Sequence, residues 1–173
     1  LAQDARVLIG RCLPYGDGTA FWPLREMLVR EFGEGLEHEL DAMLASYPEH
    51  EWIAPAVTGL LGLDARSASL EESFLAVRRL FELMADERPL VIAIEDAHWA
   101  DNVLLDLVEH LADLVRDAPI FVVLLARPEL YDVRPNWPGG RPNSTTILLD
   151  RLPPDEAEHL ASWLLEGLSV SDD

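Results

Sequence analysis

The chain contains no lysine, because its 13 basic residues are all arginine. This absence excludes any mechanism that needs a lysine from within the chain, including Schiff-base catalysis. It also excludes a complete phosphate-binding loop of the pattern G-x-x-x-x-G-K-[ST]. Cysteine is almost as scarce: Cys12 is the single thiol, so an internal disulfide is impossible and a reducing compartment is expected.

The sequence also lacks long apolar segments, and it has far fewer basic than acidic residues. No stretch approaches the roughly 18–20 apolar residues needed to span a bilayer, and residues 1–30 show no secretory signal pattern. We therefore expect a cytoplasmic protein without membrane contact. The net charge is −19 and the sequence pI is near 4.4. Such an acidic surface repels phosphate backbones, so this segment is not expected to contact DNA or RNA directly.

The chain of 173 residues is long enough for one domain with a hydrophobic core. Short apolar segments alternate with segments whose apolar residues recur at helical spacing. The predicted strands are 6–9, 90–94, 120–125 and 145–149. Helices are predicted after Pro23, at 36–45 and 53–63, after the capping-box pair Ser69 and Glu72, after Asp101, and from Pro154 to about residue 166. This alternation predicts an α/β fold with a parallel sheet flanked by helices.

Candidate site residues follow the strands, because ligands of open parallel sheets gather at the carboxyl ends of the strands. That rule selects Gly10–Cys12, Glu95–Asp96 and Ala126–Arg127. The strongest candidate is Glu95–Asp96, since a hydrophobic strand ending in two acids is a Walker B arrangement. Its first acid binds Mg²⁺, usually through water, and its second orients or deprotonates an attacking water. The alternative is a pair of solvated acids that cap the following turn.

The string EDAHWAD, residues 95–101, resembles signal-transducing P-loop ATPases of the AAA/STAND type. These domains occur in large bacterial transcription regulators and attached to class III adenylate and guanylate cyclases. The resemblance continues, in the order of the family, through residues 10–28, 69–101, 121–130 and 148–165. It therefore covers nearly the whole chain.

The resemblance implies a role for each matching position. Glu95 would be the magnesium acid, acting through water, and Asp96 the water-activating acid. Arg127 would be the sensor residue that reaches the γ-phosphate, a task that suits a planar and permanently charged guanidinium. The residues alone also allow Arg127 to be a surface arginine paired with Glu129 or Asp132. His98 and its neighbour Trp99 are expected to have a structural role.

The chain departs from the family pattern at its beginning. The first strand and the Walker A P-loop are missing, and Leu1–Ala5 resembles the tail of the helix that follows that loop. Residues 1–150 would be the post-Walker A portion of a three-layer P-loop NTPase-type core, and residues 151–173 the start of a helical lid. The chain is therefore expected to be an incomplete fold, inactive as an ATPase by itself.

The missing strand would leave a gap beside residues 120–125, and unpaired strand edges favour association. We therefore expect the fragment either to be less stable than a complete domain or to close the gap by shifting Thr145–Leu149. Self-association is a further expectation from the same open edge.

The predicted function is part of an ATP-binding and ATP-hydrolysing switch in a multidomain regulator or cyclase. ATP and Mg²⁺ would bind in the intact domain, with the P-loop segment and an effector domain as partners. The alternative is a nucleotide-free interaction or oligomerisation module with a relic site. A zinc hydrolase is not predicted, because His38–Glu39 begins H-E-x-x-H but Ala42 occupies the second histidine position.

Overall fold

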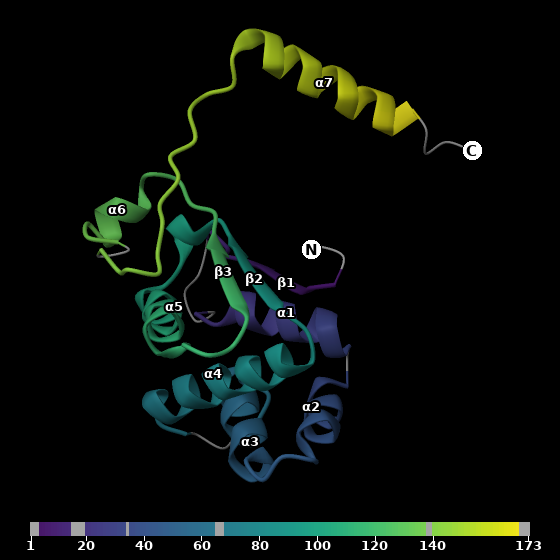
Figure 1. Ribbon diagram of the computed structural model, residues 1–173, viewed down its shortest axis with the longest axis vertical. Coiled ribbons are helices and arrows are strands. Elements are labelled where there is room, and N and C mark those ends of the chain that lie inside the picture. Colours follow the sequence, from purple (N-terminus) through teal and green to yellow (C-terminus); the bar gives the residue numbers. More distant parts are fainter. Residues whose placement is uncertain (1–3, 15–19, 34, 65–67, 138–139, 170–173) are drawn as a thin grey trace.

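The computed structural model describes residues 4–14, 20–33, 35–64, 68–137 and 140–169 (Figure 1). Its described strands are β1 (Arg6–Arg11), β2 (Leu90–Glu95) and β3 (Ile120–Leu124), which form a parallel sheet in the order β1-β2-β3. Leu90 pairs with Arg6 on one side and with Ile120 on the other. The carboxyl ends of the strands therefore meet at one edge, as the sequence predicted.

Helices fill the intervals between and after the strands. They are α1 (Trp22–Phe32), α2 (Leu36–Leu44), α3 (His50–Leu60), α4 (Leu70–Glu87), α5 (Asn102–Leu114), α6 (Leu130–Val133) and α7 (Pro154–Ser169), with a short 3-10 turn η1 (Ala97–Trp99) after β2. The predicted capping box is present at the start of α4. There the Ser69 hydroxyl accepts a hydrogen bond from the Glu72 N–H at 3.2 Å, and the Glu72 carboxylate accepts one from the Ser69 N–H at 2.8 Å. None of the described helices is both long and apolar enough to cross a bilayer.

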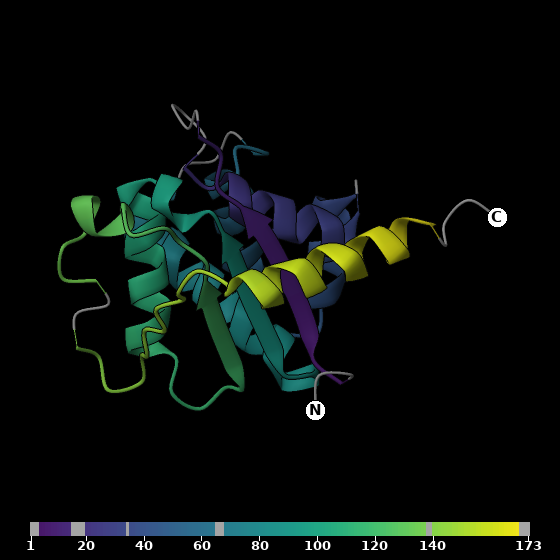
Figure 2. The same ribbon diagram turned by 90° about the horizontal axis from the view of Figure 1, so that it is seen from above.

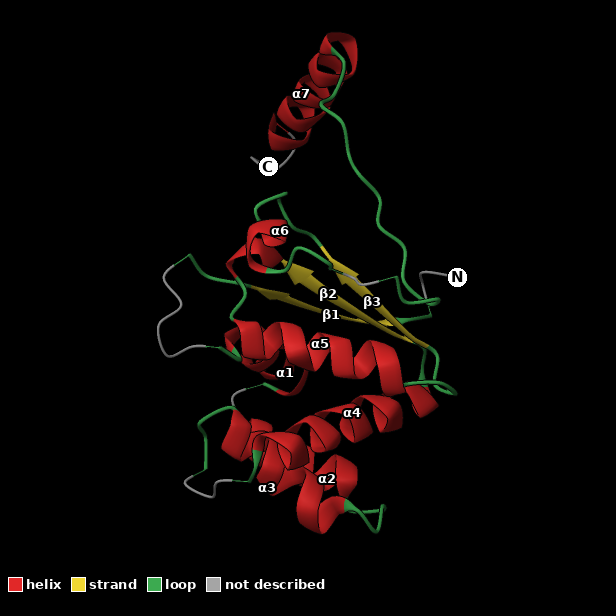
Figure 3. Cartoon of the chain, turned by 90° about the vertical axis from the view of Figure 1, so that its left-hand side faces the viewer, coloured by secondary structure: helices red, strands yellow, loops and turns green. Residues whose placement is uncertain are grey.

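The hydrophobic core lies on one face of the sheet. Helices α1, α4 and α5 pack there, and α2 and α3 pack behind them, farther from the strands (Figure 3). Leu8, Ile92 and Ile94 point into this layer and are at most 4% exposed. Side chains on the opposite face are open to solvent: Phe121 is 66% exposed and Val7 is 50% exposed. The predicted α/β fold, incomplete as expected, is confirmed.

The prediction of a strand at Thr145–Leu149 was wrong. The segment has no ladder partner among the described residues, and Ile147 and Leu149 are 77% and 86% exposed. Apolar strand-like residues need a neighbouring strand edge to form a ladder. The preceding residues are instead fixed to α5, where Arg141 pairs with Asp113 at 2.7 Å. The suggested closure of the gap by this segment is therefore absent as well.

Helix α7 lies apart from the sheet and the other helices, at the end of this extended segment (Figures 1 and 3), and in the view from above it crosses over the strands in projection (Figure 2). Its described side chains are exposed, including Trp163 at 69%. The predicted helix from Pro154 is confirmed and runs to Ser169. The helical tail expected at Leu1–Ala5 lies partly outside the described residues, and Asp4 and Ala5 form a bend.

Candidate functional site

The middle strand ends in an unusual turn. Asp96 adopts the left-handed conformation, with φ 54° and ψ 37°, and it is the one non-glycine residue with positive φ among those described. Few residues other than glycine adopt this conformation, aspartate being one of those that tolerate it, and residues that do so concentrate at functional sites. The turn is tied to the end of β3, because the Ala97 N–H donates to the Leu125 carbonyl at 2.9 Å.

Arg11 is the partner of the two acids; the sequence analysis selected the segment Gly10–Cys12 that contains it but did not pair it with them. The parallel register places Arg11 directly beside Glu95. Arg11 Nη2 lies 2.7 Å from Glu95 Oε2, and its Nε lies 3.6 Å from Asp96 Oδ2. The hydrogen bond to Glu95 and the charge of that carboxylate raise the pKa of the Arg11 guanidinium. The signal was available, because Gly10–Cys12 was selected at the carboxyl end of a predicted strand, and in the structure Gly10 and Arg11 are the last two residues of β1.

The backbone around Arg11 is held from two sides. Its own N–H donates to the Glu26 carboxylate of α1 at 2.8 Å, and the N–H of Cys12 donates to the Glu95 carbonyl at 2.9 Å. Gly10 allows α1 to start against the strand, since a Cβ at this position would lie 2.3 Å from the Pro23 carbonyl oxygen. These contacts fix the ends of β1 and β2 side by side.

Cys12 lies beneath this cluster as a buried free thiol. Burial raises the pKa of Cys12 to about 12, and the negative charge of Asp96 acts in the same direction. A thiol with such a pKa stays protonated near neutral pH and is a poor nucleophile. Cys12 is therefore part of the packing beneath the carboxylates.

Arg127 follows β3 and reaches the same edge of the sheet. Its backbone N–H donates to His98 Nδ1 at 3.4 Å, and its guanidinium lies 6.0 Å from the centre of the Trp99 ring. Within the described part of the chain, no ion pair joins Arg127 to Glu129 or Asp132. The three predicted residues thus share one edge, but the guanidinium of Arg127 lies over the Trp99 ring of η1, whereas that of Arg11 contacts the acids.

The carboxylates of Glu95 and Asp96 suit a metal ion that needs few ligands from the protein. Among the described residues, no group of three or more histidine, cysteine, aspartate or glutamate side chains could hold an ion. An all-protein cage of the kind that holds structural zinc or calcium therefore does not fit this edge. Mg²⁺ usually keeps several waters and is held by one or two carboxylates together with substrate phosphates. Glu95 and Asp96, whose side chains are each 34% exposed, fit that requirement.

A parallel sheet packed against helices, with two carboxylates at the end of its middle strand, is an α/β core whose candidate ligand edge lies at the carboxyl ends of the strands. The family model described as "AAA ATPase domain" matches residues 1–123, and the chain belongs to this family. The predicted recognition is thereby confirmed at the level of an AAA-type P-loop ATPase domain, which is a nucleotide-binding class.

An uncharacterized protein of Rhizobium meliloti (strain 1021) is similar to the chain. The two are 28% identical over 189 residues, an alignment that covers 99% of this chain and 18% of the relative. The chain therefore spans less than a fifth of the length of the relative that it matches. No solved structure matches the chain.

Proposed function

We propose that the chain is part of an ATP-binding and ATP-hydrolysing switch domain in a larger signal-transduction protein, either a transcription regulator or a nucleotidyl cyclase. The observation that carries the proposal is the position of Glu95 and Asp96 at the carboxyl end of the middle strand, in a chain of the AAA ATPase family. The length of the relative supports a larger protein with further domains.

Each site residue has a role that fits its surroundings. Glu95 would hold Mg²⁺ through water, and Asp96 would orient or deprotonate the attacking water. The ion, when bound, supplies positive charge that neutralises phosphate oxygens. Arg127 would act as the sensor of the γ-phosphate, since this exposed residue has its guanidinium over the Trp99 ring and no acidic partner in the described part of the chain.

The rest of the nucleotide site would come from a P-loop segment that this sequence does not contain. A lysine for the phosphates and a serine or threonine for Mg²⁺ belong to that loop. Residues 151–173, with α7, would begin the helical lid, and effector domains would carry the output. We place this assembly in the cytoplasm, in keeping with the single thiol Cys12.

The test is a Mg-ATP titration of two versions of the protein. One is the 173-residue chain, and the other extends it upstream by roughly the 30 residues of a strand–loop–helix unit. We expect only the longer version to bind ATP. In that version, Glu95→Gln should weaken the Mg²⁺ dependence of binding, and Asp96→Asn should abolish hydrolysis while binding persists. Asp117→Asn, which changes an exposed acid after α5, is the matched control.

A second candidate function is a nucleotide-free interaction or oligomerisation module. The exposed apolar face of the sheet favours it, because Val7, Ile9 and Phe121 together present an open surface. Absence of ATP binding by both versions, together with concentration-dependent self-association, would favour this module over the ATPase.

A further inference from the structure

The guanidinium of Arg11 is the cation that the two candidate metal-binding acids contact in this structure. Arg11 Nη2 and Nε lie 2.7 and 3.0 Å from the same oxygen of Glu95, and Nε lies 3.6 Å from Asp96. Among the described residues, no other basic side chain lies within ion-pair distance of either acid. One arginine therefore supplies the positive charge that adjacent carboxylates at a strand end require.

We propose that Arg11 is a built-in counter-ion of the Glu95–Asp96 pair and competes with the divalent cation for these carboxylates. This inference rests on the proposed function and adds a form of regulation to its site. The metal ion alone must displace the guanidinium, so its binding is weakened. The metal–nucleotide complex also brings phosphate oxygens, which are good alternative partners for the guanidinium fork. The site thereby favours the metal–nucleotide complex over the free metal ion.

The structure allows this exchange by movement of one side chain. The Arg11 side chain is 58% exposed, so its guanidinium can leave the acids and enter water without opening the core. Its backbone remains fixed, because the Arg11 N–H donates to Glu26 and the Cys12 N–H donates to the Glu95 carbonyl. The carboxylates therefore keep their positions when the guanidinium moves away.

The experiment measures Mn²⁺ binding to the 173-residue chain without nucleotide, using the paramagnetic resonance signal of the free ion. Arg11→Gln should tighten Mn²⁺ binding by roughly three- to tenfold, the range expected when an exposed competing ion pair is removed. Arg11→Lys keeps the positive charge but lacks the planar guanidinium. Its Mn²⁺ affinity should lie between those of Arg11→Gln and the unsubstituted chain. Glu95→Gln added to Arg11→Gln should abolish the gain.

Arg30→Gln is the matched control. The Arg30 side chain is 62% exposed and pairs with Glu26 at 2.8 Å, so this substitution makes the same change in net charge near the same strand end. Its Mn²⁺ affinity should stay within about twofold of that of the unsubstituted chain. Near-ultraviolet circular dichroism of each variant checks that the fold is retained.

Three outcomes would overturn the proposal: equal effects of Arg11→Gln and Arg30→Gln, weaker binding by Arg11→Gln, or no Mn²⁺ binding by any folded variant. The ATP titration tests the proposed ATPase function independently of the role of Arg11. A gain in Mn²⁺ affinity without ATP binding by the longer version would reject the ATPase and leave Arg11 as the counter-ion of a cation site. ATP binding with unchanged Mn²⁺ affinity would reject only the role of Arg11.

Discussion

The backbone N–H of Arg127 donates a hydrogen bond to Nδ1 of His98 across 3.4 Å. The acceptor role of Nδ1 requires a neutral imidazole to carry its proton on Nε2, an atom that is buried without a hydrogen-bond partner among the described residues. The His98 ring also lies 4.6 Å from that of Trp99. His98 therefore joins the turn after β2 to the segment after β3, and these contacts agree with the structural role predicted for it.

His98→Ala should lower the free energy of unfolding by roughly 0.5–1.5 kcal/mol, because the N–H of Arg127 loses its acceptor. His98→Asn should lose less, since its side-chain amide can present an oxygen to the same N–H. Urea denaturation followed by tryptophan fluorescence measures both changes. Equal losses in the two variants would show that ring packing, rather than the hydrogen bond, makes the contribution of His98.

Gly10→Ala should destabilise the chain by about 1–3 kcal/mol, because its Cβ would lie 2.3 Å from a backbone oxygen of Pro23 and would push α1 away from β1. Gly35→Ala is the matched control, since the space around Gly35 is open and its φ of −87° suits an alanine. The two urea midpoints should differ clearly. Similar midpoints would mean that the close approach of α1 to the strand is not required.

The sequence predicted the local elements of the fold well. The strand at 90–94 and the helix opened by Ser69 and Glu72 depend on apolar pattern and capping, which neighbouring residues determine. Thr145–Leu149 has the same kind of apolar pattern and does not form a strand. Its pattern could not show whether the segment reaches a strand edge in three dimensions: β3 ends the described sheet, yet this segment does not pair with it.

The candidate site also contains residues that the local sequence pattern identifies and contacts that only the folded chain shows. Glu95 and Asp96 were found because their pattern is contiguous with the strand before them. The segment Gly10–Cys12 was selected too, but the contact of Arg11 with Glu95 was missed because it joins residues 84 positions apart and exists only through the parallel register of β1 and β2. The position of the Arg127 guanidinium over the Trp99 ring likewise depends on the tertiary structure. The side chains that surround the acids could therefore be identified only from the folded chain.

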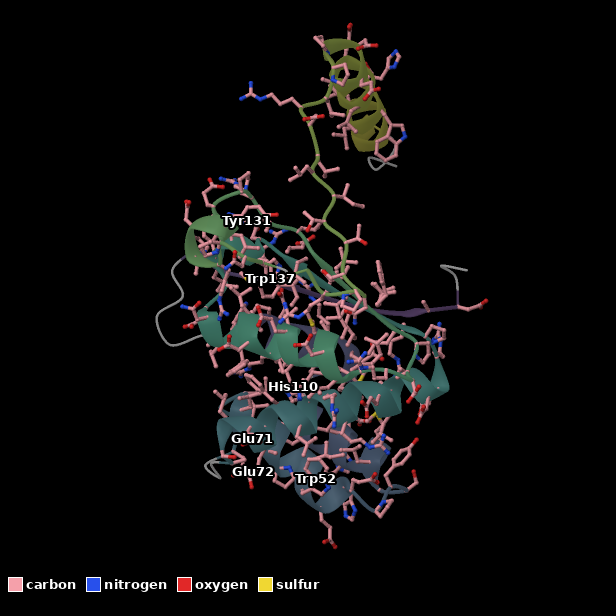
Figure 4. All side chains as sticks on the ribbon, turned by 60° about the vertical axis from the view of Figure 1, so that its left-hand side comes forward. Trp52, Glu71, Glu72, His110, Tyr131 and Trp137 are labelled. Atoms are coloured by element: carbon pink, nitrogen blue, oxygen red, sulfur yellow. The ribbon has the colours of Figure 1, made fainter. Side chains whose placement is uncertain are left out.

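His110 should make stability depend on pH. It lies on α5 facing α4, with its ring 5.7 Å from that of Phe74 (Figure 4). Burial lowers the pKa of His110, and the positive charge of Arg78 lowers it further, whereas Asp113 and Glu71 act in the opposite direction. An unfolded histidine titrates near 6.5, so below about pH 6.5 the unfolded state binds protons that the native state does not. The free energy of unfolding therefore does not depend on the titration of His110 above that pH, and it decreases as the pH falls below it, because protonation of His110 favours the unfolded state.

His110→Phe keeps a ring beside Phe74 and removes the titrating group. The difference between urea midpoints at about pH 7.5 and about pH 5.5 should be smaller in this variant than in the unsubstituted chain. His38→Gln, which changes an exposed histidine of α2, should leave that difference unchanged. An unaltered difference in His110→Phe would assign the acid sensitivity to the carboxylates instead.

The two faces of the sheet should respond differently when an apolar side chain is replaced by threonine. Phe121→Thr changes a side chain that is 66% exposed and keeps a residue that favours strands, so it should alter stability by less than about 0.5 kcal/mol. Ile92→Thr places a hydroxyl at a position that is 2% exposed and should cost about 2–4 kcal/mol. Phe121→Thr should also reduce binding of the dye anilinonaphthalene sulfonate, because that dye reports accessible apolar surface. A large loss of stability in Phe121→Thr would mean that another copy of the chain covers this face, and the loss would then diminish as the protein is diluted.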